Sequence, residues 1–226
     1  MLVPFRDLAF ACGGNVRTDP RDSRLRKKLR ARDVLLTVPH GAPGNDVLAP
    51  DVACPAHEQL RERGIDSLLL VSRVCRYSEC DQNRPQARRW PYRQAVRVAM
   101  KERPRFLLDV HSFPNSYPVY KGRDLILIHT PGVTDKKAME EFAGRLRLAA
   151  SELDRKARIE VQDQHQDVIH DIVAEAREVG LPAESVMLVE CNESGSPALY
   201  SALIRKAIMA MSRDKGWDKP VQASAK

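Results

Sequence analysis

Five short apolar runs along the chain predict five buried strands. Each run is too short for a typical helix and is rich in aliphatic residues, as is usual for strands buried on both faces of a parallel sheet. The expected strands cover residues 33–39, 66–74, 105–111, 124–129 and 186–191.

Amphipathic stretches lie between these runs and predict helices. The expected helices cover residues 55–63, 91–103, 134–157, 167–180 and 196–216. Pro55 and Pro91 suit the first turn of a helix, and Thr134 suits an N-cap position. Strands that alternate with helices predict an α/β domain, with a mostly parallel or mixed central sheet flanked by helices.

Length and charge set the domain organisation. We expect a single domain over residues 1–226, with a basic arm over about residues 1–32 and a frayed tail over about residues 217–226. Part of the net charge of +7 lies in the run "SRLRKKLRAR", from Ser23 to Arg32. We expect a solvated arm, and a nucleic-acid contact through this run is the less favoured reading.

The cysteines and the N-terminus bear on the cellular compartment. The five cysteines are scattered and include no CxxC pair. This pattern fits a reducing compartment better than a disulfide framework. The N-terminus lacks the continuous apolar region of a signal peptide, and no apolar run approaches the roughly 20 residues of a membrane helix. We therefore expect a cytoplasmic protein without a membrane segment.

Polar residues follow four of the predicted strands. In chain order they are His40; then Arg73, Arg76, Asp81, Asn83 and Arg84; then Asp109, His111 and Ser112; and finally Glu190 and Asn192. The carboxyl ends of parallel strands meet at one edge of a sheet, where binding sites form. Buried polar groups also need partners, so four such clusters at one edge point to a functional site.

These residue types suit metal-assisted hydrolysis. Two histidines and a carboxylate are the ligand set of a catalytic zinc ion, which lowers the pKa of a bound water. A further carboxylate, such as Glu190, can move the proton. An Arg beside an Asn can bind a substrate carboxylate, and Arg76 or Arg73 can stabilise an oxyanion. The sequence predicts hydrolysis of an amide bond next to a free carboxylate.

The segments "VPHGA", "CRYSECDQNRP", "LLDVHS" and "LVECNESGSPALY" resemble the N-formylglutamate amidohydrolase family over about residues 33–200. That family is similar to the zinc carboxypeptidases and to aspartoacylase-type deacylases, so the resemblance implies a zinc carboxypeptidase-like (phosphorylase/hydrolase-like) fold. It implies that His40 and His111 bind Zn²⁺ and that Glu190 is the general base. It also implies substrate-carboxylate binding by Asn83 and Arg84. Ser112 and Asn192 are further candidate substrate-binding residues.

The third metal ligand departs from the carboxypeptidase pattern. Those enzymes carry a glutamate three residues after the first histidine, where this chain has Pro43. The amidohydrolase family uses an aspartate ahead of a helix, so we expect Asp51 to be the ligand. Asp46 and Glu58 are the alternatives.

Two other aspartates and Arg76 have expected roles near the metal. Asp109 is expected to orient a histidine ring, and Asp81 to brace Arg84 or Arg76. Relative to the family pattern, one extra residue separates Arg76 from Asp81. Arg76 is therefore one residue away from the family position to which the resemblance gives the oxyanion role.

Two other functions compete with this hypothesis. A zinc carboxypeptidase that acts on peptides or peptidoglycan-like substrates would use the same fold and metal. A catalytically silent module that binds nucleic acid through its basic arm would need no stoichiometric zinc, so metal analysis separates it from both enzymes.

Overall fold

The computed structural model describes residues 8–10, 14–15, 33–42, 46–165 and 170–217. The basic run at residues 23–32 lies outside the described residues. Of the expected arm over residues 1–32, the structure describes only two short strands, at residues 8–10 and 14–15. Trp217, which we assigned to the frayed tail, is buried and packs near Phe106, with ring centroids 6.5 Å apart. The packed domain therefore extends at least to Trp217.

An eight-stranded mixed sheet forms the centre of the described structure, in the order β2-β1-β4-β3-β5-β8-β6-β7. The strands are β1 (Leu8–Phe10), β2 (Gly14–Asn15), β3 (Val34–Val38), β4 (Ser67–Ser72), β5 (Phe106–Phe113), β6 (Leu125–His129), β7 (Ile159–Asp163) and β8 (Val186–Asn192). Strands β4, β3, β5 and β8 are parallel, whereas β6 is antiparallel to β8. The expected α/β fold with a mixed sheet is confirmed.

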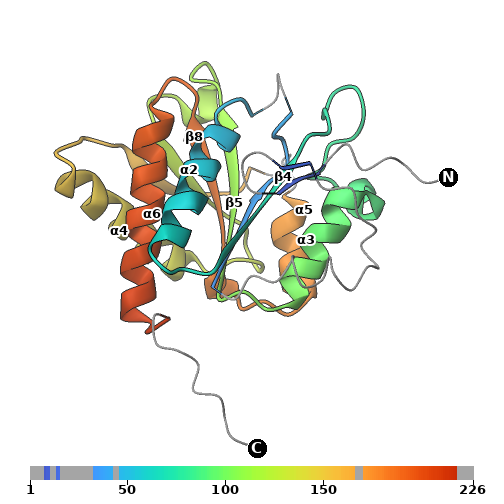
Figure 1. Ribbon diagram of the computed structural model, residues 1–226. Coiled ribbons are helices and arrows are strands. Elements are labelled where there is room, and N and C mark those ends of the chain that lie inside the picture. The colour runs from blue at the N-terminus through green and yellow to red at the C-terminus, as the bar shows by residue number, and fades with distance from the viewer. Residues whose placement is uncertain (1–7, 11–13, 16–32, 43–45, 166–169, 218–226) are drawn as a thin grey trace, which may run out of the picture.

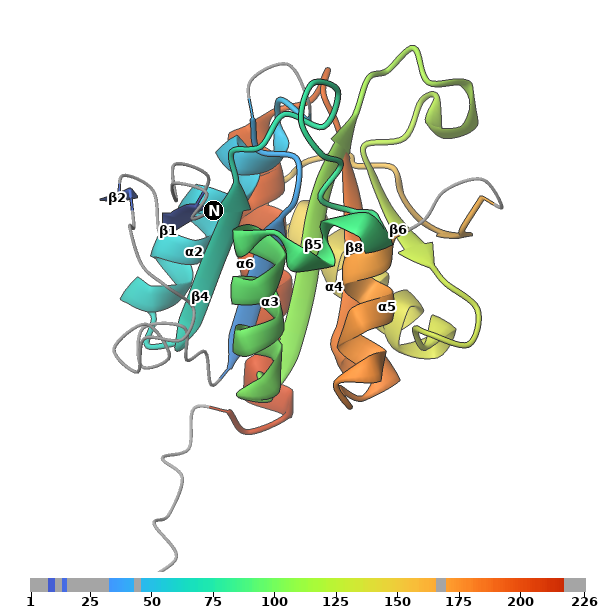
Figure 2. The same cartoon turned by 90° about the vertical axis from the view of Figure 1, so that its right-hand side faces the viewer.

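Helices cover both faces of this sheet (Figures 1 and 2). One face packs against α2 (Ala49–Glu62), α4 (Lys136–Glu152) and α6 (Pro197–Asp214). The other face packs against α3 (Pro91–Lys101) and α5 (Asp171–Glu178). Short 3₁₀ helices occur at η1 (Pro85–Arg89), η2 (Pro118–Tyr120) and η3 (Ala183–Ser185). Two apolar cores therefore hold the sheet between them, one on each side.

The starts of α2 and α4 differ from the sequence expectation. Helix α2 begins at Ala49, and Pro55 lies inside it, because Pro50 already occupies the first turn. Helix α4 is capped by Asp135, whose carboxylate accepts a hydrogen bond from the Ala138 amide at 2.7 Å. Thr134 instead pairs with Thr130 in the preceding turn.

Strand β7 was missed because its side chains are mostly only partly buried. Such a strand lies at the edge of the sheet and carries no apolar run.

The sheet topology separates the candidate site from the remaining strand ends. The carboxyl ends of the parallel strands β3, β4, β5 and β8 lie at one edge. Strand β6 runs the other way, so His129 at its end lies at the opposite edge. The four polar clusters predicted from the sequence thus belong to one edge.

The cysteines and the helices bear on the expected compartment. Cys54 is disulfide-bonded, whereas Cys75, Cys80 and Cys191 are free thiols. The cysteine pattern therefore supports a reducing compartment less than we expected. Within the described part of the chain, no helix is both long and apolar enough to cross a bilayer.

Candidate metal and substrate site

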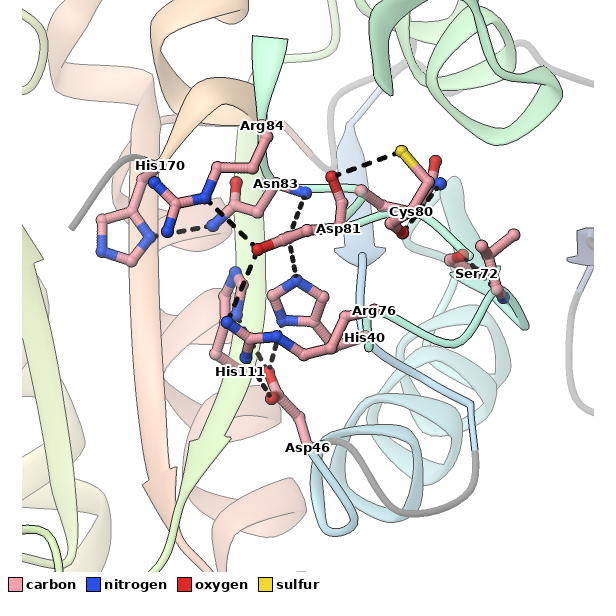
Figure 3. A network of polar contacts seen from close by, with 12 residues as sticks. His40, Asp46, Ser72, Arg76, Cys80, Asp81, Asn83, Arg84, His111 and His170 are labelled. Atoms are coloured by element: carbon pink, nitrogen blue, oxygen red, sulfur yellow. Dashed lines mark hydrogen bonds and ion pairs between the residues drawn. The ribbon is translucent and has the colours of Figure 1, made fainter. Parts of the chain in front are cut away.

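Two histidines and an aspartate converge at the carboxyl edge of the sheet (Figure 3). His40 follows β3, His111 lies on β5, and Asp46 lies in the turn before α2. Their candidate ligand atoms all lie within 4.8 Å of one another. The Nδ1 atoms of His40 and His111 lie 3.2 and 3.0 Å from Oδ2 of Asp46. All three residues are buried, so the cluster is shielded from bulk water.

A glycine lets the chain turn directly after His40. A Cβ atom at Gly41 would lie 2.3 Å from Cγ1 of Val71 and 2.8 Å from the carbonyl oxygen of Ser72. No larger residue fits this close approach to β4 without moving the backbone. The "HG" pair of the sequence is thus explained by packing.

The outer nitrogen of each histidine also faces a carboxylate. Nε2 of His40 lies 2.7 Å from Oδ1 of Asp81, and Nε2 of His111 lies 3.1 Å from Oδ2 of Asp109. The Thr37 hydroxyl donates to the other oxygen of Asp109 at 2.6 Å. Contacts of this kind fix the orientation of a ring and leave Nδ1 directed at the cluster. Asp109 therefore has the expected position, and Asp81 contacts a ring as well as the arginines.

Negative charge dominates the electrostatics of this cluster. Burial alone would raise the pKa of Asp46, but hydrogen bonds from His111 and His40 outweigh it and hold that pKa well below its usual range. Burial alone would lower the pKa of His111, but Asp109 and Asp46 raise it well above the ordinary value. Carboxylates thus surround both imidazoles, an environment that favours a bound cation.

Glu190 lies beside this cluster on the neighbouring strand. Strands β5 and β8 pair in parallel with His111 opposite Glu190, so the two side chains project from the same face of the sheet. Glu190 is only 9% exposed. Burial, with a smaller contribution from Asp46, raises its pKa to about 7, although His111 opposes this shift. A carboxyl group with such a pKa can exchange protons near neutral pH.

A cavity of about 420 Å³ opens in front of the cluster, and Arg76, Asn83 and Arg84 line it. Arg76 lies 3.7 Å from Asp46 and 3.5 Å from Asp81, and Nε of Arg84 donates to Asp81 at 3.3 Å. The side chains of Arg76 and Arg84 are 30% and 39% exposed. Both guanidinium groups therefore keep N–H donors available for an anionic ligand.

The structure corrects the choice of the third candidate ligand. Asp51 is exposed on α2, as is Glu58, and neither belongs to the cluster. Asp46, the other alternative, occupies the position between the two rings. The reason is the early start of α2, which moves Asp51 from the expected loop onto an exposed face of the helix.

The two remaining predicted substrate residues differ from each other. Ser112 lines the cavity, where its hydroxyl donates to Glu193 at 3.0 Å. The Asn192 amide instead donates to Asn115 and to the carbonyl oxygen of Arg123, at 3.0 and 2.7 Å. Asn192 lies outside the lining of this cavity and braces two loops, so its role in substrate binding stays a prediction.

Sequence reasoning gave no role to three aromatic residues that line the cavity, and it named His170 only as a less favoured candidate for lining a substrate mouth. Phe113, Tyr117 and Tyr120 form an aromatic part of the wall. His170 lies directly before α5, where the expected helix over residues 167–180 placed it inside a helix. A prediction that this helix begins at Asp171 would have placed His170 in the loop directly before it.

Comparisons with known proteins show the fold. Neither a family model nor a curated protein sequence matches this chain. The structure is similar to the gene product Atu2144 from Agrobacterium tumefaciens, with a TM-score of 0.53 and 16% identity over 93% of this chain and 96% of that one.

Two other similar structures are peptidases by name. One is the mDAP-bound form of Csd4 from Helicobacter pylori, which is described as a D,L-carboxypeptidase. Its TM-score is 0.53 and its identity is 11%, over 86% of this chain and 53% of Csd4. For a metallo-carboxypeptidase from Burkholderia cenocepacia, the TM-score is 0.50 at 12% identity over 96% of this chain and 65% of that one. This chain therefore spans about half the length of Csd4. At these identities the likenesses establish a shared carboxypeptidase-like fold.

Proposed function

We propose that the protein is a zinc-dependent hydrolase that cleaves an amide bond next to a free carboxylate. The observation that carries this proposal is the convergence of His40, Asp46 and His111 within 4.8 Å beside the cavity. Glu190, which is also buried, lies next to them on the neighbouring strand.

The donor set fits a zinc ion. Two imidazole nitrogens and one carboxylate oxygen are the protein ligands of many catalytic zinc sites, which keep a fourth position open. His40, His111 and Asp46 would hold the ion, and the surrounding carboxylates would balance its charge. When bound, zinc lowers the pKa of water and polarises a carbonyl group.

The remaining residues have separate tasks in this reaction. Asn83 and Arg84 bind the substrate carboxylate and so fix the position of the amide. Glu190 accepts a proton from the attacking water and passes it to the amine nitrogen as the C–N bond breaks. Arg76 donates hydrogen bonds to the carbonyl oxygen while that oxygen gains negative charge.

The size of the cavity favours a small substrate. Its volume of about 420 Å³ lies at the lower end of the range for small-molecule sites. An N-acyl amino acid, such as an N-formyl amino acid, fits such a site. The similarity to Csd4 and to a metallo-carboxypeptidase favours a second candidate, a carboxypeptidase that acts on short or peptidoglycan-like peptides.

Metal analysis of purified variants tests the proposed centre. We expect one zinc per chain in the parent protein, and its loss in His40→Ala, His111→Ala and Asp46→Asn. Asp51→Asn is the matched control, because this aspartate is exposed on α2 and should leave the zinc content unchanged. Full metal content in both histidine variants would contradict the site.

A substrate panel tests the reaction and separates the two candidates. It contains N-formyl and N-acetyl amino acids and short peptides, each with a free or an amidated carboxyl end. The first candidate predicts turnover of N-acyl amino acids, and the second predicts release of carboxyl-terminal residues from peptides. Equal turnover of the acids and their amides would refute recognition of a free carboxylate.

A further inference from the structure

His170 has an unusual hydrogen-bonding state at the wall of the cavity. The residue is 5% exposed, and its Nδ1 accepts a hydrogen bond from the side-chain amide of Asn83 at 3.1 Å (Figure 3). The other ring nitrogen, Nε2, is buried and has no partner in the described structure. Both residues line the cavity in front of the metal cluster.

The contact with Asn83 fixes which nitrogen of His170 carries the proton. Because the amide donates to Nδ1, that atom presents its lone pair, and the proton of the neutral ring lies on Nε2. Because Nδ1 accepts this hydrogen bond, it carries no proton, and the ring is neutral. Nε2–H is therefore a buried neutral donor that lacks an acceptor, and a ligand oxygen would supply one.

A buried cation holds His170 and Asn83 in place. Arg93 is fully buried and donates to Asp171, the first residue of α5, at 2.8 Å. The same guanidinium donates to the carbonyl oxygen of Gln82 at 2.7 Å. The backbone amide of Asp171 also donates to the carbonyl oxygen of Asn83 at 3.3 Å. The unsatisfied donor is thus set on a rigid frame, as expected of a pre-organised binding group.

We propose that His170 is a substrate-binding residue, which donates a hydrogen bond from Nε2–H to the substrate carboxylate bound by Asn83 and Arg84. This inference rests on the proposed function and extends its carboxylate subsite to a third residue. A hydrogen bond to a charged acceptor is stronger than one to a neutral acceptor. The contact would therefore increase the preference for a free acid over the corresponding amide.

Two substitutions separate the two nitrogens of the ring. His170→Asn keeps an acceptor near the position of Nδ1, and so the contact with Asn83, but removes the distal donor. His170→Gln places an amide nitrogen near the position of Nε2. The test substrate is the acid that the parent cleaves fastest in the panel above, together with its amide.

We expect His170→Asn to raise the KM of the acid by roughly 10- to 100-fold, the scale for losing a hydrogen bond to a charged group, with little change in kcat. The KM of the amide should rise less, and His170→Gln should restore part of the loss. Calorimetric titration of the acid into Glu190→Gln protein, with and without His170→Asn, should show the same fold-change in Kd without any turnover.

A matched control is available at His57 on α2. This histidine is also buried, pairs through Nδ1 with the Ser67 hydroxyl at 2.9 Å, and lies outside the cavity lining. His57→Asn should leave both KM values unchanged. An unchanged KM in His170→Asn would overturn the inference, and so would an equal rise for acid and amide or a fall in kcat alone. If the parent does not prefer the acid, the proposed function itself fails, before any His170 variant is compared.

Discussion

Glu190→Gln is the substitution that most directly tests the proposed chemistry. Glutamine keeps the shape of the side chain but cannot accept a proton. We expect kcat to fall by roughly 10²- to 10⁴-fold, the usual scale for losing general acid–base catalysis. The zinc content should not change, because Glu190 lies outside the His40–Asp46–His111 cluster.

The structure also predicts how this substitution changes stability. Folding raises the pKa of Glu190 from 4.5 to about 7, with burial as the largest cause. A carboxyl group shifted in this way disfavours the folded state by about 3 kcal/mol once it is ionised in both states. Glutamine carries no charge and avoids this cost. The variant should therefore be more stable than the parent where Glu190 is ionised.

The sign of this effect depends on pH. Below pH 4.5 the group is protonated in both states, so it adds no cost. As the pH rises from 4.5 to about 7, only the unfolded state loses its proton, and the parent loses stability relative to the variant. Urea denaturation of the metal-depleted proteins at acid and mildly alkaline pH measures this difference. Restoring zinc should reduce it, because a nearby cation favours the ionised carboxylate.

Glu193→Gln is the matched control for this experiment. Glu193 lines the same cavity and accepts a hydrogen bond from Ser112, so the control removes a carboxylate from the same wall. It should lower kcat far less than Glu190→Gln. A stability difference for Glu190→Gln that is the same at both pH values would refute the raised pKa. Loss of zinc in this variant would make Glu190 a metal ligand.

Two further predictions concern arginines. Arg84→Lys keeps the charge but loses the planar guanidinium fork, so the KM for acid substrates should rise at least about tenfold. The melting temperature should stay nearly constant. A large fall in Tm would instead indicate a structural role. Arg93→Met leaves the buried carboxylates of Asp171 and Glu175 without their shared partner and should cost about 3–5 kcal/mol in urea denaturation. Arg97→Met removes a side chain that is 44% exposed and pairs with Glu175, and it should cost less than about 1 kcal/mol. Equal losses in the two variants would refute this comparison.

Residues on the strands were predictable because strand geometry is regular. Asp109 and His111 lie two residues apart on a fully buried strand, so their side chains had to face the same side. Parallel pairing then brought Glu190 opposite His111, as expected for strand ends that meet at one edge. The buried runs thus predicted five strands and the side chains that project from their ends.

Residues outside the strands were harder to place, because their positions depend on where a helix begins. Asp46 and Asp51 are both plausible ligands in the sequence, and only the first turn of α2 distinguishes them. A start at Pro55 would leave Asp51 in the loop, whereas the observed start at Ala49 leaves Asp46 there. Pro50 and Pro55 are both compatible with a first turn, so local propensity could not decide between them.

The start of a helix also decides how His170 is placed. A helix that began at residue 167 would place His170 within its first turn as one helical residue among others, whereas the observed helix begins at Asp171 and leaves His170 at its cap. The start at Asp171 is stabilised by Arg93, which joins that carboxylate to the loop that carries Asn83 and Arg84. This ion pair connects α3 with α5, and no local sequence pattern reports such a contact. The cavity wall that carries Asn83, Arg84 and His170 therefore depends on the buried long-range contacts of Arg93, whereas strand register places His111 opposite Glu190.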